Sequence, residues 1–173
     1  MRRALVIFAT SVLLWAVVSE LNHTLTPRHV YLWIAGLFVT FSALTLPLGG
    51  GLTATFMSGL LCDAGTPLVF GTQALLFAAA HVIIFNLRDR VPRDETVARV
   101  IIALLANLTL FLLFAFLQVE RLPLPGAVWP RIIFDLVCSQ IFLVLVAPWF
   151  FALQARALEL ARPFTTSQGR DVD

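Results

Sequence analysis

Apolar and polar positions form long alternating blocks along this chain. Apolar runs of about 20 residues recur, and a helix of that length spans the ~30 Å hydrocarbon core of a bilayer. Short segments that are polar or contain Gly and Pro separate these runs. The pattern predicts six membrane-spanning helices, over residues 4–18, 30–46, 49–62, 68–87, 97–117 and 129–153.

Two details of this pattern need interpretation. Met1-Arg2-Arg3 precedes the first run, so a signal peptide cleaved after Ser19 is an alternative to a retained span. The run is long for a signal peptide, and we therefore favour a retained span. Tyr31 and Trp33 open the second run, where they predict an interfacial aromatic anchor.

The composition excludes a soluble globular protein. Apolar residues make up 60% of the 173 residues and charged residues 13%, whereas about a quarter of a soluble domain is charged. We therefore predict an all-α integral membrane protein with a single polytopic domain over residues 1–160. Residues 161–173 are expected to form a polar, disordered cytoplasmic tail.

The basic residues predict the orientation of the spans. All twelve are Arg, and the net charge is only +2, so their placement indicates membrane topology and no nucleic-acid partner. With the N-terminus and C-terminus in the cytoplasm, nine of the twelve fall in cytoplasmic segments. These nine are Arg2, Arg3, Arg88, Arg90, Arg93, Arg99, Arg156, Arg162 and Arg170, and the remaining three are Arg28, Arg121 and Arg131.

The third run carries small residues on one side of its helix. One row, at a spacing of four, is Gly51, Thr55, Gly59 and Asp63, and the next is Gly50, Ala54, Ser58 and Cys62. Small residues in such rows let a second helix approach closely in lipid. The rows therefore predict a face for helix packing or for binding a partner.

Ionisable residues within spans are candidate functional residues. Asp63 lies before a bend that contains Gly65 and Pro67, where its carboxylate either contacts a partner or caps the next helix. His81 lies too far along the fourth span to meet Asp63, and we interpret it as a hydrogen-bonded packing residue. Arg131 and Asp135 are four residues apart and are expected to pair on one helix face. Gln73, Asn107 and Gln140 are expected to form hydrogen bonds between helices.

The sequence offers little for catalysis. Ser58 and His81 raise the possibility of an intramembrane serine protease resembling rhomboids, but the Gly-x-Ser-Gly motif lacks its first Gly. Cys62 and Cys138 lie in apolar runs and are interpreted as buried thiols. The chain has no Gly-rich phosphate loop and no cluster of metal ligands, so we expect no enzyme activity, cofactor or metal.

One short motif carries a resemblance to a known family. Gly59-Leu-Leu-Cys-Asp63 is followed eight residues after the Asp by Gly71-Thr-Gln-Ala74-Leu75. This arrangement resembles the rod shape-determining protein MreD family. The segment with Pro148, the apolar stretch after it and Arg156 is also similar to the last span of that family. The chain departs from the family at Pro67, where Gly is common.

The resemblance implies a non-catalytic scaffold in the bacterial inner membrane that supports rod-shaped growth. Its implied partners are an MreC-like bitopic protein and the peptidoglycan synthase pair of RodA and a penicillin-binding transpeptidase. The family's fold is similar to the S components of energy-coupling-factor transporters. This likeness supplies an alternative function, a substrate-binding subunit for vitamin uptake. Residues 4–18, however, lack the Ala-x-x-x-Ala pattern that is common in S components.

Overall fold

The computed structural model describes residues 2–66, 69–90, 96–120, 126 and 128–161, and this part of the chain contains helices and no strand. Six α-helices account for most of it. They are α1 (Arg2–Leu25), α2 (Ala35–Thr45), α3 (Leu48–Asp63), α4 (Thr72–Leu87), α5 (Thr96–Val119) and α6 (Trp129–Leu160). Two short 3₁₀ helices, η1 (Thr26–Arg28) and η2 (Arg88–Arg90), follow α1 and α4.

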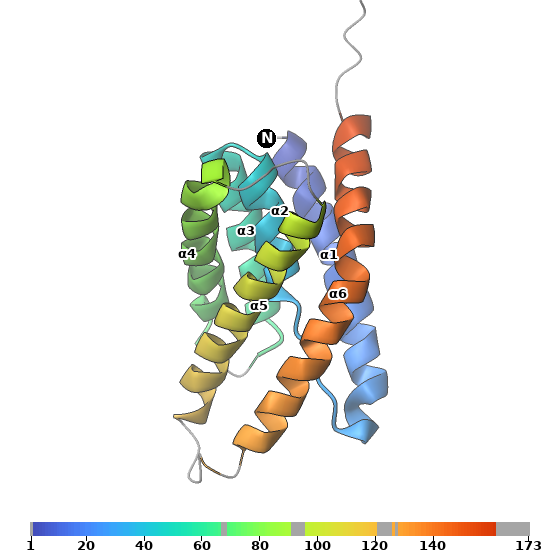
Figure 1. Cartoon of the computed structure of the whole chain (residues 1–173), viewed down its shortest axis with the longest axis vertical. Coiled ribbons are helices and arrows are strands. Elements are labelled where there is room, and N and C mark those ends of the chain that lie inside the picture. The colour runs from blue at the N-terminus through green and yellow to red at the C-terminus, as the bar shows by residue number, and fades with distance from the viewer. Residues whose placement is uncertain (1, 67–68, 91–95, 121–125, 127, 162–173) are drawn as a thin grey trace, which may run out of the picture.

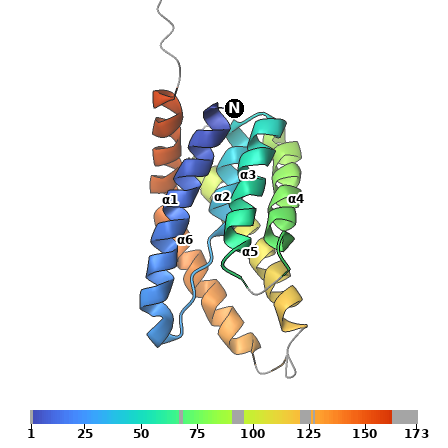
Figure 2. The same ribbon diagram turned by 180° about the vertical axis from the view of Figure 1, so that it is seen from behind.

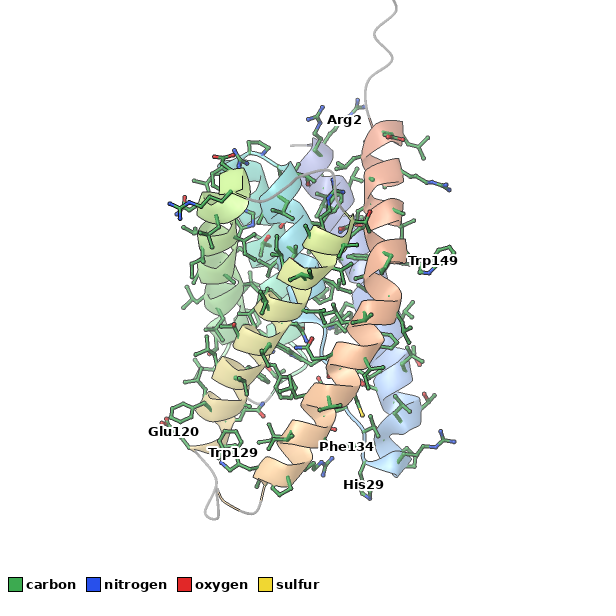
Figure 3. All side chains as sticks on the ribbon, viewed as in Figure 1. Arg2, His29, Glu120, Trp129, Phe134 and Trp149 are labelled. Atoms are coloured by element: carbon green, nitrogen blue, oxygen red, sulfur yellow. The ribbon has the colours of Figure 1, made fainter. Side chains whose placement is uncertain are left out.

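The helices run alternately up and down, so the start of α1 and the end of α6 lie at the same end of the molecule (Figure 1). Helix α2 is central, since nine of its eleven residues, Ala35 to Ala43, are buried. Helices α3 and α4 pack together as a hairpin beside α1, and α5 and α6 lie on the other side of α2 (Figures 1 and 2). Arg2 marks one end of the bundle, and His29, Glu120 and Trp129 mark the opposite end (Figure 3).

Helix length divides the bundle into two groups. Only α1, α5 and α6 are long and apolar enough to cross a membrane, among the residues described. Helices α3 and α4 have 16 residues each, or about 24 Å at 1.5 Å per residue. The end of α3 and the start of α4 lie partway along the molecule and stop short of the end reached by α1, α5 and α6 (Figures 1 and 2). The predicted number of helices, six, is thus confirmed. Three of the six are shorter than a membrane span requires.

The predicted start of the second span, at residue 30, is wrong. Residues 30–34 are not helical, and α2 begins only at Ala35. The predicted role of Trp33 as an interfacial anchor is also wrong, because its side chain is buried in the protein core. Its ring stacks on Phe114 with centroids 5.6 Å apart and meets Phe77 and Phe111 edge-on. Trp33 therefore joins this segment to the cores of α4 and α5.

Other helix boundaries also differ from the predicted ones. Helix α1 continues to Leu25, seven residues beyond the predicted end of the first run, and α4 begins at Thr72. Trp129 and Pro130 open α6 as expected, but α6 continues through Pro148 to Leu160. Of the predicted disordered tail, residues 161–173, all but residue 161 lie outside the described residues, as does Pro67 in the bend.

Candidate functional site

The small face of α3 packs directly against α4. A side chain at Gly59 would collide with the backbone of Ala74, so this contact requires glycine. A side chain at Gly51 would reach within 2.5 Å of the imidazole of His81. The row predicted from the sequence therefore packs within the chain, where its small residues let the backbones of α3 and α4 approach closely.

Asp63 caps the N-terminus of α4. Its Oδ2 accepts hydrogen bonds from the amides of Gly71, at 3.0 Å, and Ala74, at 3.1 Å. Its Oδ1 accepts a hydrogen bond from the amide of Gln73 at 2.9 Å. A carboxylate at this position satisfies helix-end amides that have no partner within the helix and interacts favourably with the helix dipole.

Gly71 allows the chain to turn into α4. Its φ is +97°, in the left-handed region that favours glycine. This conformation directs its amide toward Asp63, eight residues earlier. Gly59, Asp63, Gly71 and Ala74 are thus one structural unit, which we call the hairpin lock.

The hairpin lock decides between the two interpretations of Asp63. Asp63 is 3% exposed, and both of its carboxylate oxygens accept hydrogen bonds from backbone amides of this chain. Capping of the next helix is observed, and the carboxylate is not presented to a partner. The unit is therefore a folding device, and a partner surface must be sought elsewhere.

His81 lies deeper in the same interface, in contact with two hydroxyl groups. Its Nδ1 lies 3.1 Å from Oγ1 of Thr55 and 3.3 Å from Oγ of Ser42, and the two hydroxyl oxygens are 2.6 Å apart. Its ring also stacks on Phe85. This geometry agrees with the interpretation of His81 as a packing residue and links α2, α3 and α4. Ser58 donates to the carbonyl of Ala54 in its own helix, and no hydrogen bond joins it to His81 in the described structure.

Residues 30–34, which we call the strap, depend on polar side chains from other helices. Asn22 of α1 pairs with Leu32 as a neighbouring strand would, because its Oδ1 accepts from the Leu32 amide at 2.7 Å and its Nδ2 donates to the Leu32 carbonyl at 2.9 Å. Ser139 of α6 accepts from the amide of Trp33 at 3.0 Å. Buried backbone outside a helix requires such partners in place of water.

Asn107 of α5 holds the junction between the strap and α2. Its Nδ2 donates to the carbonyl of Trp33 at 3.2 Å, and its Oδ1 accepts from the amide of Gly36 at 3.1 Å. Close approach is needed here too, because a side chain at Gly36 would collide with the carbonyl of Ala103. Asn107 thus forms bonds between helices, as expected.

Asp135 of α6 contacts the strap and its predicted partner. Its Oδ1 accepts from the amide of Tyr31 at 3.1 Å, and its Oδ2 lies 3.9 Å from Nε of Arg131. The expected pairing of Arg131 and Asp135 is therefore present. Gln140 donates to the carbonyl of Leu104 and so bridges α6 to α5, as expected. Gln73 instead bonds within the hairpin bend, to Thr66.

Two cavities flank the strap. One, of about 190 Å³, lies between α1, the strap and the hairpin bend and is lined by residues that include Trp15, Trp33 and Gln73. The other, of about 450 Å³, lies between the strap, α5 and α6 and is lined by residues that include Phe114, Arg131 and Asp135. Tyr31, Trp33, Gly65 and Thr66 line both. The strap therefore forms a wall shared by both cavities.

Sequence reasoning missed Asn22 and Ser139. The sequence places Asn22 in a polar loop and Ser139 in the last span, without indicating a partner for either. Asn22 is ten residues from Leu32 in sequence, and Ser139 is 106 residues from Trp33. The one available signal is the presence of polar side chains beside long apolar runs, which does not identify their partners.

The described residues contain no group of three or more His, Cys, Asp or Glu that could hold a metal. Cys62 and Cys138 are free and half-buried. Comparisons of the chain with protein-family models, curated proteins and solved structures gave no match.

Proposed function

We propose that this protein is a non-catalytic scaffold of the bacterial inner membrane that holds the membrane anchor of an MreC-like partner beside the wall-elongation machinery. The proposal includes a fold similar to S components, with six membrane passes and both termini in the cytoplasm. The observation that carries it is the hairpin lock. The four residues of the lock all belong to the motif that resembles the MreD family, and each has a physical role in closing α3 onto α4.

The placement of Arg residues supports the proposed orientation. Arg2, Arg88 and Arg156 lie toward the end of the bundle where α1 begins and α6 ends. Arg28 and Arg131 lie toward the opposite end, in η1 and the first turn of α6. An excess of Arg on one side is typical of the cytoplasmic side of a membrane protein.

A groove between α4 and α5 offers a surface for the partner. It has a volume of about 380 Å³ and is lined by apolar residues and Thr109. Ala79, Ala80 and Ala106 contribute small side chains to it, which allow close approach of another helix in lipid. Because Asp63 is turned inward, we place the apolar span of the bitopic partner in this groove.

Deletion and complementation in a rod-shaped host test the proposal. Loss of the gene is expected to give rounded cells, and the wild-type chain is expected to restore rods and to co-purify with a single-span partner. Ala79→Leu fills the groove and is expected to lose both properties while still inserting in the membrane. Ala152→Leu makes the same change on the exposed face of α6 and is expected to behave as wild type.

Other outcomes would contradict the scaffold proposal or favour the transporter alternative. Normal rods after deletion, or co-purification unchanged by Ala79→Leu, would contradict the scaffold proposal. Co-purification with two ATPases and a transmembrane coupling protein would favour the alternative of a transporter subunit.

A further inference from the structure

The larger cavity beside the strap has charged residues in its wall, whereas the described residues that line the smaller one include none. The charged residues are Arg131 and Asp135, one helical turn apart on α6. Arg131 lies in the first turn of this helix, at the end of the bundle that Trp129 marks in Figure 3. The cavity wall thus carries a positive group near the end of the bundle and a negative group about one turn further in.

Both charged groups can be reached from outside the protein. The side chain of Arg131 is 58% exposed and that of Asp135 is 12% exposed. Oδ1 of Asp135 accepts from the Tyr31 amide, whereas Oδ2 accepts no hydrogen bond from the described residues. Oδ2 is nevertheless not among the buried atoms that lack a partner, and it is therefore accessible to a ligand.

The two charged groups do not satisfy each other. Nε of Arg131 lies 3.9 Å from Oδ2 of Asp135, which is beyond hydrogen-bond distance. A partly exposed pair of this kind contributes little to stability, so a ligand can replace it at little cost. The guanidinium offers several donors in a planar fork, and the carboxylate oxygen only accepts. The pair therefore suits a ligand that carries both an anionic group and an N–H donor.

Charge and surroundings narrow the class of ligand to a zwitterionic lipid. A ligand with one charge of each sign compensates both wall charges, and guanidinium binds phosphate through two parallel hydrogen bonds. A primary ammonium group donates to a carboxylate, whereas a quaternary one has no N–H. Leu112 of α5 and Phe134 of α6 are each three residues from a lining residue, and these apolar side chains are 41% and 54% exposed. They offer surface to acyl chains beside the cavity.

We propose that this cavity binds the head group of phosphatidylethanolamine, with the phosphate on the guanidinium of Arg131 and the ammonium on Oδ2 of Asp135. The volume of about 450 Å³ is well above the ~150 Å³ of an engineered cavity that holds benzene, so a head group fits. The site is independent of the scaffold proposal, because it shares no lining residue with the groove between α4 and α5. Asp135 also holds the amide of Tyr31, so binding is coupled to the strap.

Native mass spectrometry of the full chain in detergent, titrated with lipids of identical acyl chains, tests the proposal. Phosphatidylethanolamine carries both charges, phosphatidylcholine replaces the N–H donors with methyl groups, and phosphatidylglycerol keeps the phosphate without a cation. Wild type is expected to retain one phosphatidylethanolamine molecule about tenfold more tightly than either of the others, the typical effect of one charge-assisted hydrogen bond. Equal retention of all three lipids, or tighter retention of phosphatidylglycerol, would overturn the proposal.

Paired variants assign the two contacts. Asp135→Asn keeps an oxygen for the Tyr31 amide but replaces the second acceptor with a donor, and it is expected to abolish the preference for phosphatidylethanolamine over phosphatidylcholine. Arg131→Gln changes an exposed side chain and is expected to weaken all three lipids about tenfold. Arg28→Gln, an exposed arginine outside the cavity, is the control and should change none. A preference that survives Asp135→Asn, or equal effects of the two arginine variants, would overturn the proposal.

The free head group separates a lipid site from a site for a soluble zwitterion. O-Phosphoethanolamine carries the same charges without acyl chains. It is expected to displace phosphatidylethanolamine only at a large molar excess, because it lacks the apolar contacts of the chains. Displacement at equal concentration would overturn the lipid assignment and identify a soluble zwitterion as the ligand.

Discussion

The hairpin lock and the strap solve the same problem in different ways. Both contain backbone amides that no helix satisfies, in a protein whose apolar helices are compatible with a lipid environment. In the hairpin lock, one carboxylate eight to eleven residues away serves three amides. In the strap, four side chains from α1, α5 and α6 share the task, and all but Asn22 are more than 70 residues distant.

This difference has consequences for folding and stability. The hairpin lock needs only residues 59–74, so it forms from local contacts, whose loop-closure cost is small. The strap can be satisfied only after α1, α5 and α6 have assembled around it. We therefore expect the hairpin lock to be the more stable unit and the strap to be the region that responds to changes elsewhere.

Gly59→Leu, in the hairpin lock, should reduce the stability of the protein more than any other change considered. The new side chain collides with the backbone of Ala74, and overpacking against backbone costs about 3 kcal/mol or more. We expect loss of the folded protein in a detergent unfolding assay. Leu60→Ala, on the half-buried side of the same helix, should be mild, and equal tolerance of the two changes would contradict the packing of α3 on α4.

Asp63→Ala should cause the second-largest loss of unfolding free energy. It leaves the buried amides of Gln73 and Ala74, and that of Gly71, without their acceptor. The expected loss is about 2–4 kcal/mol of unfolding free energy, since each unmet buried group costs about 1–3 kcal/mol and the end of the helix can relax. Glu159→Ala, an exposed carboxylate on α6, is the matched control and should stay within about 0.5 kcal/mol of wild type.

Asn107→Leu should have a smaller and more local effect. It removes the bonds to the Trp33 carbonyl and the Gly36 amide, but Asn22 and Ser139 still hold the strap. We expect a loss of about 1–3 kcal/mol by the same unfolding assay. Thr109→Ala, which changes an exposed residue on the same helix, should be nearly neutral. A loss as large as that of Asp63→Ala would mean that the strap is no less essential than the lock.

The same contrast explains what could be predicted from the sequence. The packing row of Gly51, Thr55 and Gly59, the capping alternative for Asp63 and the pairing of Arg131 with Asp135 were all predictable, because each depends on residues close in sequence or on helical spacing. The six helices were likewise predictable from the apolar runs.

The strap was not predictable, for a physical reason. Residues 30–34 are apolar enough to continue a helix, and nothing local prevents it from starting at residue 30. Their non-helical form depends on Asn107, Asp135 and Ser139, whose positions are known only once the bundle is assembled. The cavities beside the strap follow from the same assembly, so the sequence identifies Gln73 as polar but not as a lining residue.

Hydrogen exchange, measured by mass spectrometry in nanodiscs, tests the separation of the two regions most directly. Asp63→Ala is expected to speed exchange of the amides of residues 71–74 while those of residues 31–36 remain protected. Asn107→Leu is expected to do the reverse. If either variant opens both segments to the same extent, the hairpin lock and the strap form one cooperative unit, and their division into a local and an assembled region is wrong.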